Sequence, residues 1–415
     1  MYKKYKLKNK VNVMLVPLAD TKSVTVLVMY PVGSRYEPEK LAGVSHYIEH
    51  LMFKGTKKRP NTLALTREID RLGADYNAFT SKEYTGYYIK VDKKFTKTAV
   101  DILADMLFNS KFDAKEMERE KGPIVEEIRM YKDNPLMNIS NIFEDLFYSG
   151  SPLGRDIAGT EKHVLSYKRN DVLAFRDKYY QPQNMTIVVA GNVDESTEKL
   201  LEQYFGSEEN KGKINKNFKE YKIGSEKLKI EKKETDQVQL MLGFPSFKHN
   251  DKRNSTVSVL NTIFGGSMSS RLFIEIRERR GLAYMVRSGS DRYRDAGYVY
   301  VRVGLEAKNI NKAVKIVKNE VEKLIKKGVT TRELKDAKTH IRGGLTLSFE
   351  DSSAQASFYA SQMLFAEELK TPEEKLAEID KVTNEDIMRV AKQIFKWNKM
   401  KVAIIGQVDE EKIVF

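Results

Sequence analysis

Two stretches decide the fold: DVLAFRDKYYQPQNMTIVVAGNVD at Asp171–Asp194 and DIMRVAKQIFKWNKMKVAIIGQVD at Asp386–Asp409. They lie 215 residues apart (386 − 171) and align without a gap. Each has the pattern of an amphipathic helix, a short turn and an apolar strand that ends in Gly, one polar residue, Val and Asp. The match indicates that the chain contains two copies of one unit.

A second match supports this duplication. SVTVLVMYP at Ser23–Pro31 resembles QVQLMLGFP at Gln237–Pro245, with an offset of 214 (237 − 23). In a chain of 415 residues we therefore expect two tandem homologous domains, over residues 1–206 and 227–415. Residues 207–226 between them are polar and rich in lysine, which predicts a linker.

The order of the expected elements indicates the fold class. Strand-like runs occur at Val11–Val16, Val24–Tyr30 and Tyr84–Val91, and helical runs follow at Asp113–Asp133 and Asn311–Lys327. Strands that follow one another closely favour hairpins. The sequence therefore predicts an α+β fold in which each domain is a mainly antiparallel sheet packed with helices, rather than a doubly wound parallel sheet.

Composition excludes several classes of function. The net charge is +14, but acids and bases are interleaved along the chain and no zinc knuckle or RNP-type motif occurs, so we expect no nucleic-acid partner. No run approaches the ~18 apolar residues of a membrane span. The basic start at Met1–Lys10 leads into an alternating run rather than a signal-peptide core, so we expect a cytoplasmic protein without a membrane partner. The lack of cysteine excludes disulfides, thiolate metal sites and a cysteine nucleophile.

The clearest chemical signal is HYIEH at His46–His50, which holds two of only five histidines. The surrounding segment Leu41–Lys54 has helical periodicity, which places both imidazoles on one helix face, one turn apart. They can therefore hold one metal ion, and Glu49 is placed to reach a water molecule on that ion, as in the inverted zinc motif. Imidazole and carboxylate ligands favour zinc, and a catalytic zinc site needs a third protein ligand.

The third ligand should be acidic and lie on another element. The predicted helix Asp113–Asp133 offers five glutamates: Glu116, Glu118, Glu120, Glu126 and Glu127. Glu120 and Glu127 are seven residues apart and share a helix face. Spacing alone does not choose among the five, because each also fits an ordinary solvated helix surface.

HYIEHLMFKGT at His46–Thr56 resembles the active-site helix of the pitrilysin/insulinase family of zinc metallopeptidases, which includes the mitochondrial processing peptidase and bacterial relatives. The resemblance extends over essentially the whole chain. In the family, 76 residues separate the second His from a third ligand, and 127 − 50 − 1 = 76 implies Glu127. A second family glutamate, seven positions earlier, implies that Glu120 orients the site. Gly122-Pro123 departs from the pattern, and an interior proline predicts a kink between the two glutamates.

The second half lacks these ligands. Adding 214 to positions 46, 49, 50 and 127 gives four apolar residues: Leu260, Ile263, Phe264 and Ile341. We therefore expect this domain to bind no metal. Family members carry an Arg and a Tyr seven residues apart in the domain that faces the zinc, and Arg277 and Tyr284 match that spacing. The resemblance implies that this pair binds the peptide carbonyl and stabilises its oxyanion.

A docking surface for the peptide is implied by GADYNAFTSKEYTGYYIKV at Gly73–Val91, which resembles the active-site edge strand of the family and the strand after it. Asn77, Ala78, Phe79 and Thr80 match the part that meets substrate. An edge strand can pair with an extended peptide through backbone hydrogen bonds.

Together, the resemblance implies a zinc endopeptidase that cleaves extended or unfolded peptides inside a chamber. One Zn²⁺ per chain would be held by His46, His50 and Glu127, with Glu49 as general base. Because the chain carries both the zinc set and the Arg/Tyr pair, we expect a homodimer with composite active sites, in which the pair acts on the partner subunit's zinc. The alternatives are the zinc-bearing subunit of a heterodimeric peptidase and a noncatalytic peptide-binding subunit.

Overall fold

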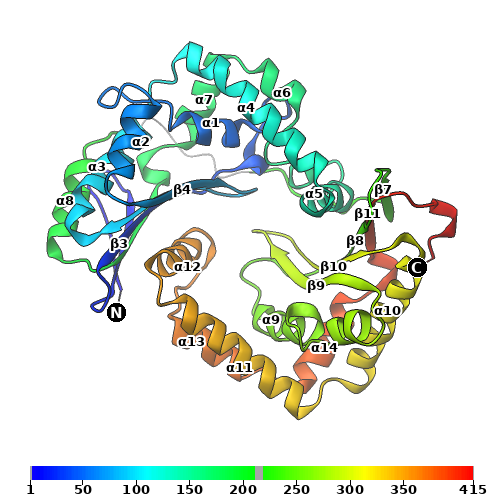
Figure 1. The fold of residues 1–415 in the computed structure, drawn as a ribbon. Coiled ribbons are helices and arrows are strands. Elements are labelled where there is room, and N and C mark those ends of the chain that lie inside the picture. The colour runs from blue at the N-terminus through cyan, green and yellow to red at the C-terminus, as the bar shows by residue number, and fades with distance from the viewer. Residues whose placement is uncertain (1, 211–217, 415) are drawn as a thin grey trace. The chain divides into compact units, whose positions relative to one another are not determined.

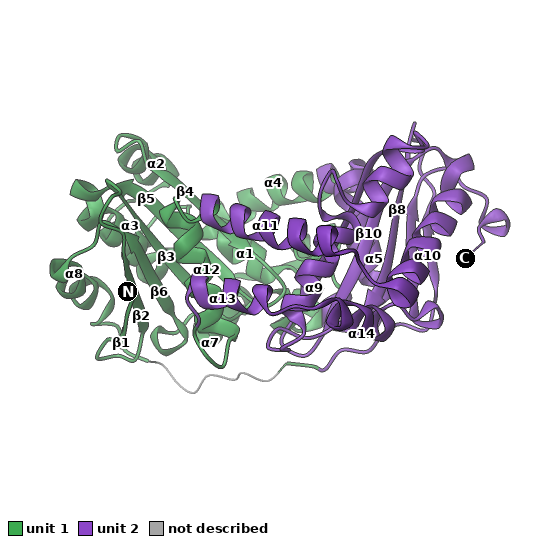
Figure 2. Ribbon diagram, turned by 90° about the horizontal axis from the view of Figure 1, so that it is seen from below, with its two compact units in different colours: residues 1–129, 155–219, 348–369 green, residues 130–154, 220–347, 370–415 purple. Residues whose placement is uncertain are grey.

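The computed structural model describes residues 2–210 and 218–414, so part of the linker expected at 207–226 lies outside the described residues. The chain forms two compact units (Figure 2). The first contains residues 1–129, 155–219 and 348–369, and the second contains residues 130–154, 220–347 and 370–415. Each unit therefore includes a segment from the other half of the sequence.

The first unit is built on a six-stranded sheet (Figure 1). The strands lie in the order β1-β2-β6-β3-β5-β4, and all neighbours are antiparallel except β2 and β6. Their bounds are β1 Lys3–Lys6, β2 Asn12–Pro17, β3 Ser23–Tyr30, β4 Asp75–Thr80, β5 Thr85–Asp92 and β6 Thr186–Gly191. Strand β4 forms one edge of this sheet.

Both faces of this sheet are buried, which explains the nearly continuous apolar run of β3. Val24, Val26 and Val28 belong to the core under the helices of one face, whereas Leu27 and Met29 face α12 on the other. The helices of the unit are α1 Val44–Leu51, α2 Thr62–Asp70, α3 Thr96–Asn109, α4 Ala114–Asp133, α6 Glu161–Ser166, α7 Arg169–Tyr179, α8 Glu195–Phe205 and α12 Ser352–Phe365. Only the last four residues of α4 are counted in the second unit.

The second unit repeats this plan with five strands in the order β7-β11-β8-β10-β9, of which only β7 and β11 are parallel. The strands are β7 Leu228–Glu231, β8 Val238–Pro245, β9 Ala283–Arg292, β10 Gly297–Leu305 and β11 Lys401–Ile405. The helices are α5 Pro135–Phe147, α9 Asn254–Asn261, α10 Ile310–Lys327, α11 Thr331–Ser348, α13 Pro372–Asp380 and α14 Asn384–Ile394. The prediction of an α+β fold with mainly antiparallel sheets is confirmed.

The two halves of the sequence exchange one helix each. Helix α5 of the first half packs through Phe143 and Phe147 on Met241 of β8, in the second unit. Its counterpart α12, 217 residues later (352 − 135), packs through Ala360 on the first sheet. In Figure 1, where colour follows residue number, the exchange is visible because the orange α12 lies beside the blue β3. In each sheet, a helix from the other half therefore covers one face.

The structure corrects the residue correspondence between the halves. Helices α1 and α9 begin at 44 and 254, an offset of 210, so the counterparts of positions 46, 49 and 50 are Thr256, Val259 and Leu260 rather than the residues at offset 214. None of these three side chains is a usual zinc ligand. The interior Pro123 does not end α4, which runs unbroken from Ala114 to Asp133. Proline has no N–H group to donate to the carbonyl of Arg119 one turn earlier. Because Pro123 lies on the exposed side of the helix, water can bond to that carbonyl instead.

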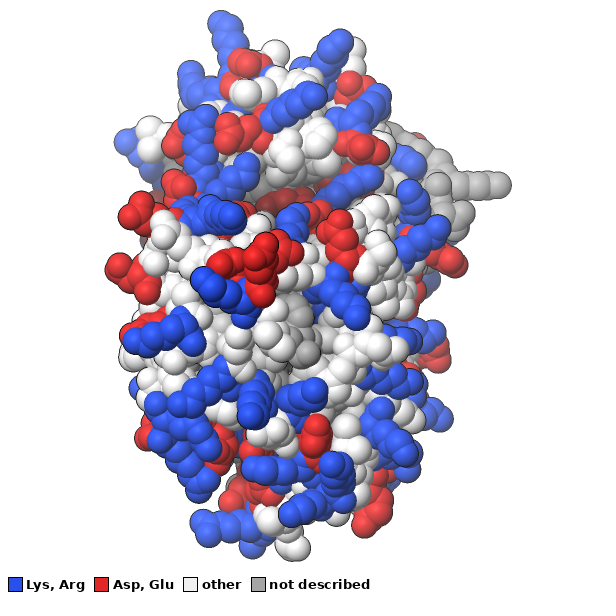
Figure 3. Space-filling view, turned by 90° about the vertical axis from the view of Figure 1, so that its right-hand side faces the viewer, with Lys and Arg blue, Asp and Glu red and all other residues white. Residues whose placement is uncertain are grey.

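Two surface observations bear on the classes of function expected from composition. Among residues 2–210 and 218–414, no helix combines the length and apolar character that a membrane crossing requires. On the face drawn in Figure 3, basic and acidic side chains are interspersed in the upper part, and basic ones predominate in the lower part. On this face, charges of both signs therefore share the surface.

Candidate metal centre and active site

Helix α1, which carries the HYIEH segment, begins at a residue that must be glycine. Gly43 has φ 95°, and a Cβ atom there would lie 2.3 Å from the carbonyl oxygen of Ala158. The carboxylate of Glu37 caps the helix by accepting hydrogen bonds from the N–H groups of Gly43 (2.6 Å) and Ser45 (2.7 Å). These N–H groups have no partner within the helix, so Glu37 fixes where α1 starts.

We expect Glu37→Gln to lower the free energy of unfolding by about 1–3 kcal/mol, because one of the two buried N–H donors would face an amide NH2 group, which cannot accept a hydrogen bond, whereas both oxygens of a carboxyl group can. Burial raises the pKa of Glu37 to about 7, although the hydrogen bonds from Ser45 and Gly43 oppose this. Since the folded pKa lies above the ordinary value of 4.5, the folded chain binds this proton more tightly than the unfolded chain. The stability from this group is therefore complete below pH 4.5 and is lost as the pH rises through 7.

Thermal unfolding checks this prediction. The difference in Tm between wild type and Glu37→Gln should narrow from about pH 5 to about pH 8. Glu39→Gln is the matched control, because its side chain is exposed and should leave Tm unchanged. A pH-independent difference in Tm would contradict the titration, and no difference would contradict the capping role.

The structure brings His46, His50 and Glu127 together. One ligand atom from each lies within 4.8 Å of the others, and among the described residues no other group of His, Cys, Asp or Glu does this. Glu127 Oε2 is 3.6 Å from His46 Nε2 and 3.4 Å from His50 Nε2. Ligands of a tetrahedral zinc ion at about 2.0–2.2 Å lie roughly 3.3–3.6 Å apart, so this donor set fits zinc in spacing and in chemistry.

The electrostatics of the two histidines differ. Burial and the nearby His50 lower the pKa of His46, which keeps its imidazole neutral. Burial also disfavours charged His50, but its hydrogen bonds to Glu120 and Glu127 outweigh this and raise its pKa to about 9. The hydrogen bond from His50 is the main cause that lowers the pKa of Glu127. A bound cation would take the place of the proton that His50 and Glu127 share.

Glu120 is placed behind His50. Its Oε1 accepts a hydrogen bond from His50 Nδ1 (2.9 Å), and its Oε2 lies 2.6 Å from Lys54 Nζ. Burial works to raise the pKa of Glu120, but the hydrogen bonds from His50 and Lys54 hold it below its usual value. With the proton on Nδ1, His50 presents the lone pair of Nε2 to a metal. Sequence reasoning assigned no role to Lys54, which lies three residues beyond the end of α1.

Glu49 points to a different partner. Its Oε2 accepts a hydrogen bond from the hydroxyl of Thr80, the last residue of β4. Burial raises the pKa of Glu49, and the bond from Thr80 opposes that rise. The side chains of His46, His50 and Glu127 are 12%, 24% and 29% exposed, so solvent can reach the centre.

The strand residues expected to meet substrate lie on the edge strand β4, and their side chains alternate. Asn77 is exposed and its Oδ1 accepts a hydrogen bond from the N–H of Ala78. Ala78 is buried in the core that includes α1. Phe79 packs on the other side of the sheet, against Tyr84. The backbone pairs with β5 on one side, which leaves the outer side of β4 without a strand neighbour in the described sheet.

Arg277 and Tyr284 meet in the second unit. The guanidinium carbon of Arg277 lies 5.0 Å from the ring centre of Tyr284 and 4.8 Å from that of Phe273. Arg277 lies within the helical segment Phe273–Glu278, and Tyr284 is the second residue of β9, where it is 75% exposed. The two donors therefore lie on one surface and can both reach a ligand there.

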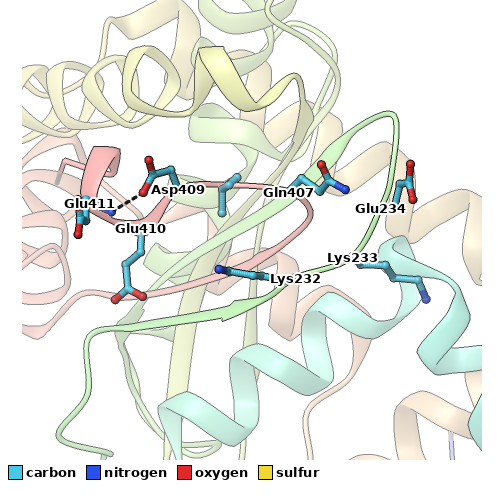
Figure 4. Close-up of a pocket in the computed structure, with 8 residues that line it drawn as sticks. Lys232, Lys233, Glu234, Gln407, Asp409, Glu410 and Glu411 are labelled. Atoms are coloured by element: carbon cyan, nitrogen blue, oxygen red, sulfur yellow. Dashed lines mark hydrogen bonds between the residues drawn. The ribbon is translucent and has the colours of Figure 1, made fainter.

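A hollow in the second unit lies where the segments after β7 and β11 meet (Figure 4). Lys232 and Lys233 come from one segment, and Asp409, Glu410 and Glu411 from the other. In Figure 4 the carboxylate of Asp409 accepts a hydrogen bond from the backbone of Glu411. This open hollow mixes both signs of charge. Among the described residues the one metal-binding triad is that of His46, His50 and Glu127, so the candidate metal centre lies in the first unit.

Family comparisons match both halves of the chain. Residues 12–161 match the model "Insulinase (Peptidase family M16)", and residues 166–341 match "Peptidase M16 inactive domain". The chain is 36% identical to "Uncharacterized zinc protease YmxG" of Bacillus subtilis, over 95% of this chain and 96% of that protein. It is 34% identical to an "Uncharacterized zinc protease" of Rickettsia felis, over 97% of each chain.

Solved structures show the same fold. A protease from Helicobacter pylori superposes with a TM-score of 0.92 at 24% identity, covering 98% of this chain and 99% of that one. A protein from Pseudomonas fluorescens described as "peptidase M16 inactive domain" gives a TM-score of 0.90 at 20% identity, covering 98% of each. At these identities the likeness extends to the architecture alone.

Proposed function

Because the chain belongs to the insulinase family of peptidases (peptidase family M16), we propose that it is a zinc-dependent endopeptidase. The observation that carries this proposal is the convergence of His46, His50 and Glu127, two of which, His50 and Glu127, interact electrostatically with the carboxylate of Glu49. The names of the relatives from Bacillus subtilis and Rickettsia felis, each given as an uncharacterized zinc protease, support the choice of metal. We expect one zinc ion per chain, held by these three ligands.

When bound, zinc supplies Lewis acidity that makes water a better nucleophile and polarises a carbonyl group. Glu49 accepts the proton of the attacking water and passes it to the leaving amine, which makes it the general base and then the general acid. Glu120 keeps the proton of His50 on Nδ1 and so holds Nε2 ready as a ligand.

Substrate binding is assigned to β4. An extended peptide adds to its outer edge through backbone hydrogen bonds, with Asn77, Ala78 and Phe79 alongside it. Such pairing makes little demand on the peptide's sequence and requires it to be unfolded locally. Arg277 and Tyr284 donate hydrogen bonds to the carbonyl oxygen as negative charge develops on it.

The assembly we propose is a homodimer that encloses a chamber. One chain carries the metal ligands and the Arg277/Tyr284 pair, so two copies contain every group of two sites, each completed by the pair of the partner subunit. We further propose a cytoplasmic enzyme that acts as a processing peptidase on peptides. The alternative of a heterodimer assigns the chain only the zinc site. The alternative of a noncatalytic subunit assigns the chain peptide binding alone; the description "Peptidase M16 inactive domain" covers residues 166–341, the half without the metal ligands, and so fits an active and a noncatalytic chain equally.

The experiment that tests the function measures size, zinc content and cleavage of a quenched peptide mixture on the same purified sample. We expect a dimer with about one zinc per chain, loss of cleavage on chelation and recovery when zinc is returned. Activity that appears only after a second protein is added would support the heterodimer. A chain that binds peptide and does not cleave it, with zinc present, would contradict the peptidase function.

A further inference from the structure

The side chain of Glu49 is held by an element other than its own helix. Thr80 donates its hydroxyl hydrogen bond to Glu49 Oε2, and this bond joins the edge strand β4 to α1. Along β4, Thr80 is two residues after Ala78, so both side chains face the core that includes α1. The bond uses one carboxylate oxygen of Glu49 and leaves the other available.

The position of Thr80 is fixed by the hairpin that joins β4 to β5. Thr80 pairs with Thr85 across the hairpin, and Ser81 N–H donates to the carbonyl of Tyr84 (2.8 Å). The hydroxyl of Thr85 donates in turn to the carbonyl of Val32 (2.9 Å), in the interior. These bonds set the backbone on both sides of Thr80, so its hydroxyl has little freedom to move away.

The turn of this hairpin is clamped to the segment before α1. Arg35 Nη1 and Glu83 Oε1 are 2.6 Å apart, and their side chains are 0% and 3% exposed. The N–H of Arg35 also donates to the carbonyl of Lys82 (2.9 Å). The backbones approach so closely that a Cβ at Gly33 would lie 2.0 Å from the carbonyl oxygen of Ser81. A buried ion pair that keeps its hydrogen bonds is costly to break, so the turn is a rigid support.

The same short segment reaches α1, since Glu37 caps the helix two residues after Arg35. Helix α1, which carries Glu49, and the hairpin that carries Thr80 are therefore both bonded to residues 34–37. The distance between the two side chains is set by this shared support rather than by local sequence. A glutamate alone has several side-chain rotamers, and fixing one before the reaction removes an entropy cost from the barrier.

We propose that Thr80 is a positioning residue for Glu49: its hydroxyl holds the carboxylate in the orientation that proton transfer needs. This inference rests on the proposed function. Because a peptide would pair with β4 beside Thr80, the strand that docks the substrate also orients the base. Displacement of a catalytic group by about 1 Å can cost about 10²-fold in rate, so the effect should appear in kcat.

The test compares Thr80→Val, which keeps the shape and removes the hydroxyl, with Thr80→Ser, which keeps the hydroxyl. We expect Thr80→Val to lower kcat by about 10–100-fold with little change in KM or zinc content, and Thr80→Ser to retain most of the wild-type kcat. The matched control is Thr66→Val on α2, whose hydroxyl bonds only the carbonyl of Thr62 among the described contacts. That variant should cleave at the wild-type rate.

A double-mutant cycle shows whether Thr80 acts through Glu49. On a Glu49→Gln background, Thr80→Val should reduce the residual rate by less than twofold, because the oriented group is already lost. Wild-type kcat in Thr80→Val, or equal losses in both backgrounds, would overturn the inference. If Thr80→Val does not fold, Thr80→Ala against Thr80→Ser gives the same comparison. A wild-type chain that cleaves no peptide would instead contradict the proposed function itself.

Discussion

Replacement of Glu49 by Gln is expected to slow peptide cleavage by about 10²–10⁴-fold while zinc stays bound. The amide has the size of the carboxylate but cannot accept a proton from water, and general base catalysis contributes about 10²–10⁴-fold to the rate. Glu49 is not among the three residues whose ligand atoms converge, so the metal site should remain intact. Metal analysis and a quenched-peptide assay on the same sample measure both quantities.

The comparison variant is His50→Ala. It removes a ligand and the hydrogen-bond partner of Glu120, so zinc content and cleavage should both be lost. The two variants separate chemistry from metal binding, because Glu49→Gln is predicted to change cleavage alone, whereas His50→Ala is predicted to change both cleavage and zinc content. Cleavage by Glu49→Gln at the wild-type rate would show that another group accepts the proton.

Residues 1–206 expressed alone are expected not to fold, although they span one complete copy of the repeat. This half lacks α12, which covers Met14, Leu27, Met29 and Val188 on one face of the first sheet. Burial of each such side chain contributes about 1.5–3 kcal/mol, so exposing them together approaches or exceeds the total stability of a domain. Solubility and far-UV circular dichroism of the isolated half measure the result.

Two further samples make this prediction specific. Co-expression with residues 207–415 should restore soluble protein, because it returns α12. In the full chain, Ala360→Asp should lower Tm strongly, since Ala360 is fully buried against the sheet, whereas Ser357→Asp on the exposed side of the same helix should not. A soluble, cooperatively unfolding fragment of residues 1–206 would show that the helix exchange is dispensable.

Local pattern was enough to predict several of the elements. Helix α10 was expected at Asn311–Lys327 and lies at Ile310–Lys327, because its apolar residues recur at the helical period. The start of α1 was harder to predict: helical periodicity from Leu41 indicated an earlier start than Val44. The difference arises because Glu37 caps the chain at Gly43, and a cap formed across six residues leaves no periodic signal.

The candidate site, too, could be predicted from the sequence only in part. His46 and His50 could be paired from sequence, since residues four apart share a helix face. Spacing left five glutamates open as the third ligand, and only the family resemblance pointed to Glu127. The structure places Glu127 beside both imidazoles and adds Lys54, which holds Glu120 from the other side. An ion pair between side chains 66 positions apart (120 − 54) has no signature in either local segment.

The sequence by itself determined that two copies of one α+β unit follow each other and that one copy carries a paired-histidine helix. These properties are local, because hydrophobic period and residue spacing are read within a few turns of chain. Only the tertiary structure decided that α5 and α12 are exchanged and that Thr80 meets Glu49. Whether an apolar face is buried, and whether a buried polar group finds a hydrogen-bond partner, both depend on how the whole chain folds. Several partners fit each local pattern, and only the folded chain selects one of them.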